Sequence, residues 1–95
     1  MMEITLEPSL SHCIETIAQR EYQRVLSLLL RGKQEDRQLE EKVELLRRFL
    51  ELSDFSQLRS RCEEFLLAGR RVEVILRSTN GLPEYEIEAT EINEA

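Results

Sequence analysis

Residues 38–52 restrict the fold of this chain more than any other segment, because they predict a helix with two apolar sides. At about 100° per residue, one set of apolar side chains falls on one face, and a second set is rotated by roughly a third of a turn. A helix with two apolar sides needs two neighbours, so we expect the rest of the chain to pack around it. The first set is Leu39, Val43, Leu46 and Leu50, and the second set is Leu45, Phe49 and Leu52.

The segments on either side of this one also have a helical apolar period, so the chain up to residue 68 is predicted to be helical apart from its start. The connection between the first and second helices is only about three residues long, which favours antiparallel neighbours. The break before the third helix is shorter still. The three predicted helices span about residues 10–31, 35–52 and 54–68.

Two of the helix starts carry candidate capping residues. A serine near the first helix, Ser9 or Ser11, can accept a hydrogen bond from the free backbone amides there. Asp54 and Gln57 have the spacing of a capping box, which predicts that the third helix begins at once after the second.

From residue 71 the apolar period changes from 3.6 to 2, which predicts a β-hairpin with strands at about 71–78 and 83–91. Asn80 and Gly81 lie between the two runs, and this dipeptide is typical of a two-residue hairpin turn in which both residues have positive φ. Placing the turn there puts the alternating apolar residues of the two runs (Val72, Val74, Leu76, Tyr85, Ile87 and Ala89) on one face, which supports the register. The resulting pairs are Leu76 with Tyr85, Val74 with Ile87, Val72 with Ala89, Arg77 with Glu84, and Glu73 with Glu88.

An isolated hairpin is only marginally stable in water, so it must pack on the helices or gain a third strand. Alternating apolar residues at the N-terminus predict a short strand at residues 2–6, although an extended arm without a partner fits them as well. We therefore predict an α+β fold for a single domain of residues 1–95, in which a three-helix antiparallel bundle precedes a C-terminal β-hairpin.

The chain is acidic, with a formal net charge of −6, and this argues against nucleic acid as its partner. All thirteen basic residues lie between Arg20 and Arg77. The N-terminus lacks the basic and apolar segments of a signal peptide, and no apolar run approaches the roughly 18 residues that span a bilayer. We expect a cytoplasmic protein that does not bind membranes.

No residue pattern predicts catalysis. The one histidine, His12, precedes Cys13, and adjacent helical side chains point about 100° apart, so they do not form a nucleophile–base pair. Cys13 and Cys62 are far apart in the sequence and on apolar faces, which favours buried free thiols over a metal site or a disulfide. The glycines resemble helix ends and turns, not a phosphate loop. We expect no enzyme, no metal site and no cofactor.

We favour a small protein–protein interaction or regulatory module that forms a homodimer or binds another protein. Apolar side chains on the first two helices exceed what a short chain covers easily, and a partner surface would bury them. Two alternatives stay open: the hairpin and the N-terminal strand could cover these residues within one chain, and the hairpin edge could accept a partner strand. The candidate interaction residues are Leu26, Leu30, Leu45, Phe49 and Leu52.

A winged-helix-like nucleic-acid-binding protein is the alternative function, because three helices followed by a hairpin have the element order of that fold. The third helix would then read the nucleic acid and the hairpin would be the wing. The short break before this helix and the glutamates on the hairpin argue against it. The candidate contact residues are Gln57, Arg59, Ser60 and Arg61.

Overall fold

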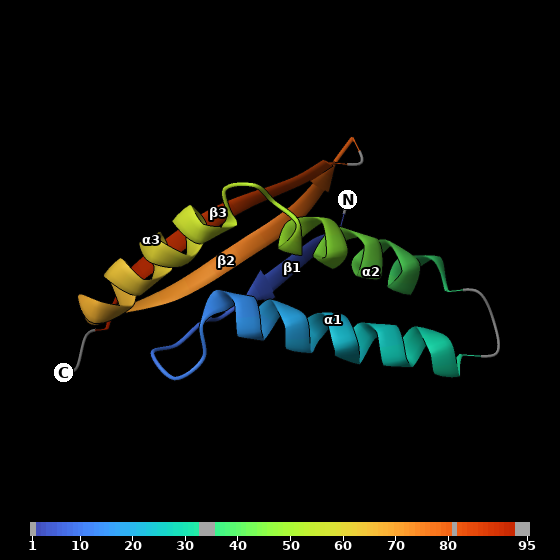
Figure 1. Ribbon diagram of the computed structural model, residues 1–95, viewed down its shortest axis with the longest axis horizontal. Helices are drawn as coiled ribbons and strands as arrows, with labels where there is room; N and C mark the ends of the chain where they lie inside the picture. Colours follow the sequence, from blue (N-terminus) through green and yellow to red (C-terminus); the bar gives the residue numbers. More distant parts are fainter. Residues whose placement is uncertain (1, 33–35, 81, 93–95) are drawn as a thin grey trace.

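The structure is a computed structural model that describes residues 2–32, 36–80 and 82–92. In this part of the chain it confirms the α+β fold, with a short N-terminal strand, three helices and a C-terminal hairpin (Figure 1). The elements are β1 (Glu3–Leu6), α1 (Ile14–Arg31), α2 (Arg37–Leu50), α3 (Phe55–Leu67), β2 (Arg70–Thr79) and β3 (Leu82–Glu91).

The strands form an antiparallel sheet in the order β1-β2-β3. The predicted hairpin register is confirmed at all five predicted pairs, including Glu73 opposite Glu88. The N-terminal segment supplies the third strand, because Ile4 pairs with Leu76 at the other edge of β2. Asn80 has the positive φ (51°) that a two-residue turn requires. The matching prediction for Gly81 lies outside the described residues.

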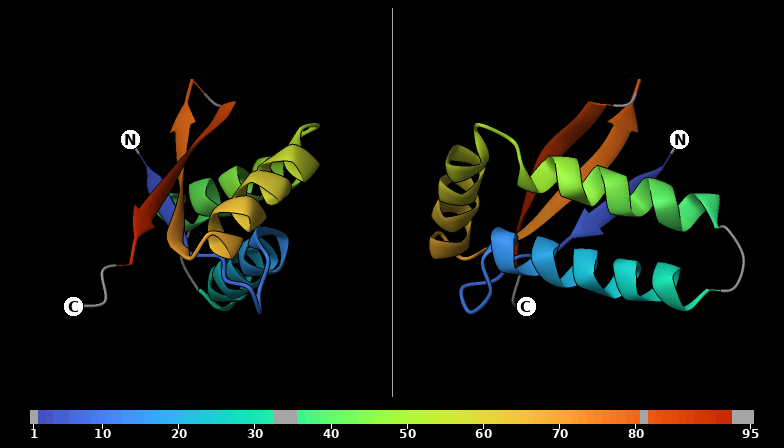
Figure 2. Two further views of the ribbon diagram at one scale, coloured as in Figure 1. Left: turned by 90° about the vertical axis from the view of Figure 1, so that its left-hand side faces the viewer. Right: turned by 45° about the vertical axis from the view of Figure 1, so that its right-hand side comes forward.

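The described helices all lie on one face of this sheet (Figure 2). α1 and α2 run side by side, whereas α3 packs against β2 (Figure 1). α3 buries Leu58 and Cys62. The predicted three-helix bundle is therefore not confirmed. The helical apolar period of residues 54–68 predicts that one side of this helix is buried, but such a side packs on a sheet as well as on another helix.

Both apolar sides of α2 are covered inside the one chain. Leu46 and Phe49 are fully buried, and Leu45 is 4% exposed. The Phe49 ring meets the Phe55 ring edge to face at a centroid distance of 5.2 Å, and it lies 6.1 Å from the Tyr85 ring. Edge-to-face pairs of this kind stabilise a core beyond the area that they bury. α2 is thus the element that joins α1 to the sheet.

α1 begins at Ile14, four residues later than predicted. The preceding residues form a tight turn in which Ser9 N–H donates to His12 C=O (2.8 Å) and His12 N–H donates to Ser9 C=O (3.2 Å). The Ser9 hydroxyl also accepts from His12 N–H (3.1 Å), so it stabilises this turn and does not cap the helix. The N-cap position belongs to Cys13.

The predicted capping box at the start of α3 is wrong, since the Asp54 side chain makes no capping hydrogen bond. Its Oδ2 instead accepts from the Tyr85 hydroxyl at 2.7 Å. A phenol that is partly buried needs such a partner, and the hairpin brings it to this carboxylate. This hydrogen bond joins the start of α3 to β3.

The clearest side-chain cap is Asp36, whose Oδ1 accepts from the backbone N–H groups of Gln38 (3.0 Å) and Leu39 (3.2 Å). Asp36→Ala is expected to lower the free energy of unfolding by about 1 kcal/mol, because two amides at the start of α2 lose their acceptor. Urea unfolding followed by circular dichroism measures this loss. Glu40→Ala is the control, since it also removes an acid from the first turn but removes no cap. Equal losses in the two variants would contradict the role of Asp36.

Candidate interaction surfaces

The sheet covers only part of α1. Figure 1 shows that the C-terminal half of α1 and the adjoining end of α2 extend beyond the strands. α1 buries Ile14, Ala18 and Val25, but near its C-terminal end Leu30 is 76% exposed and Leu28 is 43% exposed. The leucine-rich end of α1 therefore carries apolar surface that the sheet does not reach.

Three apolar side chains of the C-terminal half of α1 and the turn before it form a row along the helix. Tyr22, Leu26 and Leu30 follow one another at intervals of four residues, a spacing that places them on the same side of a helix. Tyr22 and Leu26 are half-buried and Leu30 is exposed. We call these three residues the α1 stripe. It contains both residues of α1 that the sequence predicted for interaction.

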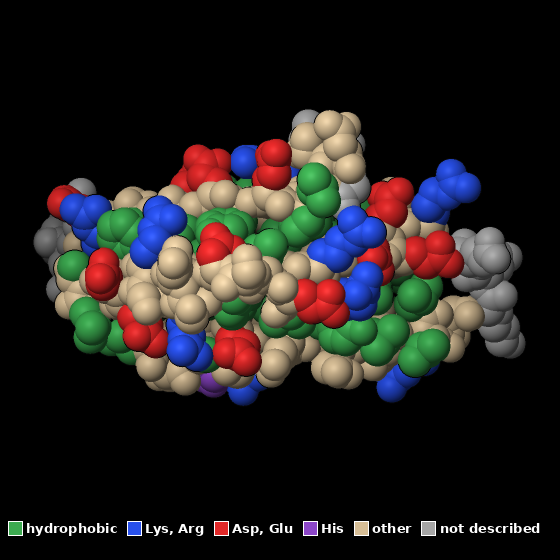
Figure 3. Space-filling model, turned by 45° about the horizontal axis from the view of Figure 1, so that its top comes forward, with side chains coloured by type: hydrophobic (Ala, Val, Ile, Leu, Met, Phe, Trp, Pro, Cys, Tyr) green, Lys and Arg blue, Asp and Glu red, His purple; other side chains and the backbone are tan. Residues whose placement is uncertain are grey.

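The charges of α1 are nearly balanced. The helix has three basic residues and two acidic ones, and the Arg24 guanidinium pairs with the Glu21 carboxylate. The excess negative charge of the chain lies elsewhere. On the face shown in Figure 3, hydrophobic side chains lie open among charged ones over the region of α1 and α2. A second acidic copy could thus approach α1 with little charge repulsion.

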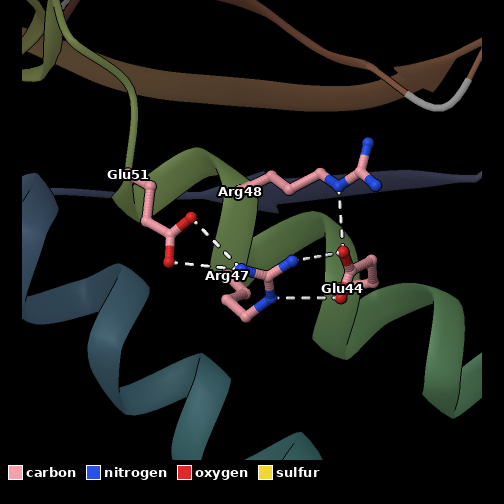
Figure 4. Close-up of polar contacts among 4 residues, drawn as sticks. All are labelled: Glu44, Arg47, Arg48 and Glu51. Carbon is pink, nitrogen blue, oxygen red and sulfur yellow. Dashed lines mark hydrogen bonds and ion pairs between the residues drawn. The ribbon is translucent and has the colours of Figure 1, made fainter.

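The exposed side of α2 carries an ion-pair network (Figure 4). Arg47 donates through Nε (3.1 Å) and Nη2 (2.5 Å) to the Glu44 carboxylate, and Arg48 Nε donates to Glu44 Oε1 at 2.9 Å. Arg47 Nη1 also donates to both oxygens of Glu51 at 3.2 Å. The Glu44–Arg48 pair has the spacing of i, i+4 that stabilises helices. The network holds the last two turns of α2 together.

This network makes stability depend on pH. Hydrogen bonds from Arg47, and then from Arg48, lower the pKa of Glu44 from 4.5 to about 2. Because the folded pKa is depressed, the contribution of Glu44 is complete above about pH 4.5 and is lost as the pH falls toward about 2. Glu44→Gln is therefore expected to destabilise the chain at pH 7 and to do so much less at pH 2, where the Glu44 carboxylate of the folded chain is about half protonated. Urea unfolding of both proteins at the two pH values tests this. A difference in free energy of unfolding between wild type and variant that is the same at both pH values would contradict it.

The two cysteines line one cavity of about 220 Å³ at the other end of the molecule. The Cys13 thiol lies 3.3 Å from the Thr16 hydroxyl, and hydrogen bonds from the Thr16 side chain and backbone lower its pKa. Burial raises the pKa of the Cys62 thiol to about 11. Both are free thiols, and Cys13 is only half-buried at the start of α1, in contrast to the predicted burial. The cavity is lined by Pro8, Ser9, Leu10, Cys13, Ile14, Arg59, Cys62, Glu63, Leu66 and Leu67.

His12 does not line this cavity, so the structure places it in no common site with the two thiols. Among the described residues, no group of three or more His, Cys, Asp or Glu side chains is arranged to hold a metal ion. In the same part of the chain, no helix has the length and apolar character needed to cross a membrane.

The residues predicted to contact nucleic acid are exposed on α3. Arg59 Nη1 lies 3.5 Å from Glu15 Oε2, so its charge is partly balanced within the chain. The hairpin that would serve as a wing exposes Glu84, Glu86 and Glu88. The structure thus gathers Gln57, Arg59, Ser60 and Arg61 on one exposed helix next to an acidic hairpin.

The five predicted interaction residues lie in two different environments. Leu45 and Phe49 belong to the core of the single chain, and Leu52 is half-buried against it. Burial by the sheet therefore removes Leu45 and Phe49 from any surface of the folded chain. Leu26 and Leu30 remain on the surface. The candidate interaction residues predicted from the sequence do not include the other exposed large apolar residues of the structure: Leu10, Leu28, Leu67, Leu82 and Ile92.

Comparison with known proteins gives a family match and one relative. A protein-family model matches residues 2–88 of the chain. Over 62 residues the chain is 44% identical to an uncharacterised protein of Archaeoglobus fulgidus, and the alignment covers 63% of this chain and 72% of that protein. No solved structure matches the chain. These similarities indicate no activity.

Proposed function

We propose that this chain, which belongs to the family whose model matches residues 2–88, is a small non-enzymatic module that acts by binding a second copy of itself. The observation that carries the proposal is Leu30, which is 76% exposed at the end of α1 and follows the half-buried Tyr22 and Leu26 on the same side of the helix. Burying one leucine fully stabilises a complex by about 1.5–3 kcal/mol. The non-enzymatic part rests on the sequence, which has no catalytic pattern.

Two copies of the α1 stripe suit a symmetric contact. In a dimer with C2 symmetry the same patch serves both copies, so Leu30 of one copy would lie against Tyr22 and Leu26 of the other. Antiparallel packing of two α1 helices would bury each stripe along its length. The balanced charge of α1 adds no like-charge repulsion to this arrangement. A homodimer through α1 is therefore the arrangement that we favour over binding to a different protein.

Methyl NMR of leucine-labelled protein tests the proposal over a concentration range from about 10 μM to about 1 mM, which covers weak dimers. We expect the methyl signals of Leu26 and Leu30 to shift with concentration. Leu67 is the internal control, because it is as exposed as Leu30 (76%) and lies at the end of α3, away from the leucine-rich end of α1 (Figure 1). Shifts that are absent, or that occur at Leu67 and not on α1, would contradict the proposal.

A further inference from the structure

The outer edge of β3 offers backbone groups for another strand. β3 is ten residues long and lies at the edge of the sheet, and no strand among the described residues pairs with its outer side. In an antiparallel ladder, hydrogen-bonded residue pairs alternate with non-hydrogen-bonded pairs. The pair that closes a two-residue turn is hydrogen-bonded, and here that pair is Thr79 with Leu82. By this count Tyr85, Ile87 and Ala89 direct their N–H and C=O groups away from β2. These groups are spaced to receive a further strand.

The two faces of the sheet carry different side chains along β3. On the helix side, Tyr85 and Ile87 are half-buried and pack against the core. On the opposite face β3 exposes a row of glutamates, of which Glu86 pairs with Arg77 at 3.0 Å. Glu88 lies opposite Glu73, whose carboxylate lies 4.0 Å from Arg71 Nε, and among the described residues Glu88 itself forms no ion pair. On one face this edge is thus apolar, and on the other it exposes glutamates, of which Glu88 forms no ion pair with a described residue.

A second copy of this chain does not fit the edge. Antiparallel pairing of two β3 strands about a two-fold axis would keep the faces of both sheets aligned. Glutamates of one copy would then lie opposite glutamates of the other, and like charges directly opposite are destabilising. The strand that fits must carry basic side chains where β3 carries acidic ones.

We infer that the β3 edge binds an extended segment of another protein by antiparallel strand addition, and that this segment alternates basic and apolar residues. Its basic side chains would lie beside Glu84, Glu86 and Glu88, and would give Glu88 an ion-pair partner. Its apolar side chains would extend the apolar face at Tyr85 and Ile87. Backbone hydrogen bonds give affinity in this mode of binding, and the side chains on the two faces give specificity. The inference does not depend on self-association, which uses α1.

Titration calorimetry with short blocked peptides tests the inference on the full chain. The probe is an eight-residue peptide of alternating lysine and valine, and the charge control replaces each lysine by glutamate. In antiparallel pairing, residues directly opposite share a face, so the valine N–H groups would point at β3. N-methylation of the valine amides should abolish binding to the chain, whereas N-methylation of the lysine amides should not change the affinity. Equal binding of the two methylated peptides, or binding of the glutamate peptide, would overturn the inference.

Two variants of the chain locate the site. Ala89→Pro removes an N–H group that points away from β2, so it should block the peptide without breaking the hairpin ladder. Glu88→Lys should weaken binding by about three- to tenfold, since it replaces an attraction with a repulsion. Glu40→Lys makes the same charge change in the first turn of α2 and should have little effect. Equal weakening by Glu88→Lys and Glu40→Lys would mean attraction to net charge only, and would contradict a site at β3.

Discussion

Phe49→Ala is expected to lower the free energy of unfolding by about 3–5 kcal/mol, the largest loss for any single substitution discussed. Phe49 is fully buried, and its ring contacts Phe55 at the start of α3 and Tyr85 on β3. Truncation at this position leaves a cavity where α2, α3 and the sheet meet, and none of them can close it alone. Because small proteins have about 5–15 kcal/mol of stability, the variant should lose a large share of its free energy of unfolding.

Urea unfolding followed by far-ultraviolet circular dichroism measures this effect at a protein concentration low enough to keep the chain monomeric. Leu30→Ala is the matched control, because it truncates a large apolar side chain that is 76% exposed. We expect the control to change the free energy of unfolding by less than about 0.5 kcal/mol. A loss below about 1 kcal/mol for Phe49→Ala would contradict the central position of α2 in the core.

Leu30→Glu is expected to weaken self-association by at least about a hundredfold. A symmetric dimer contains Leu30 twice, so the substitution removes the burial of two leucines and places two carboxylates in the contact. Loss of about 3 kcal/mol corresponds to roughly a hundredfold change in dissociation constant. Leu67→Glu makes the same change at an equally exposed leucine on α3 and should leave self-association unchanged. Similar weakening in both variants would show that the α1 stripe is not the contact.

The hairpin could be predicted from the sequence in detail because its signals are local. The Asn80 turn and the alternation on either side of it determine which residues face each other, and the structure confirms each predicted pair. The apolar stripes of α2 and α3 were equally visible. A stripe shows that a side is buried, but it does not show whether a helix or a sheet covers it, so the bundle was predicted where α3 packs on β2.

Features that depend on distant residues could not be predicted. The Asp54 carboxylate looked like a helix cap, but it accepts a hydrogen bond from Tyr85, which is 31 residues further along the chain. The sequence predicts a partner surface for Leu45 and Phe49, because nothing in their spacing shows that the sheet reaches them. Both side chains are buried in the structure. Leu26 and Leu30 belong to the C-terminal half of α1, which extends beyond the strands (Figure 1). How far the strands extend along α1 decides whether these two side chains are covered. The surface that remains on α1 could therefore be predicted only in part.

Sedimentation equilibrium of the wild-type chain at several concentrations from about 10 μM to about 1 mM, with Leu30→Glu measured beside it, tests self-association through α1 most directly. The chain has a mass of 11.2 kDa. We predict that the wild-type mass rises toward twice this value with concentration, and that the Leu30→Glu mass stays at 11.2 kDa. A wild-type mass of 11.2 kDa at every concentration would contradict self-association.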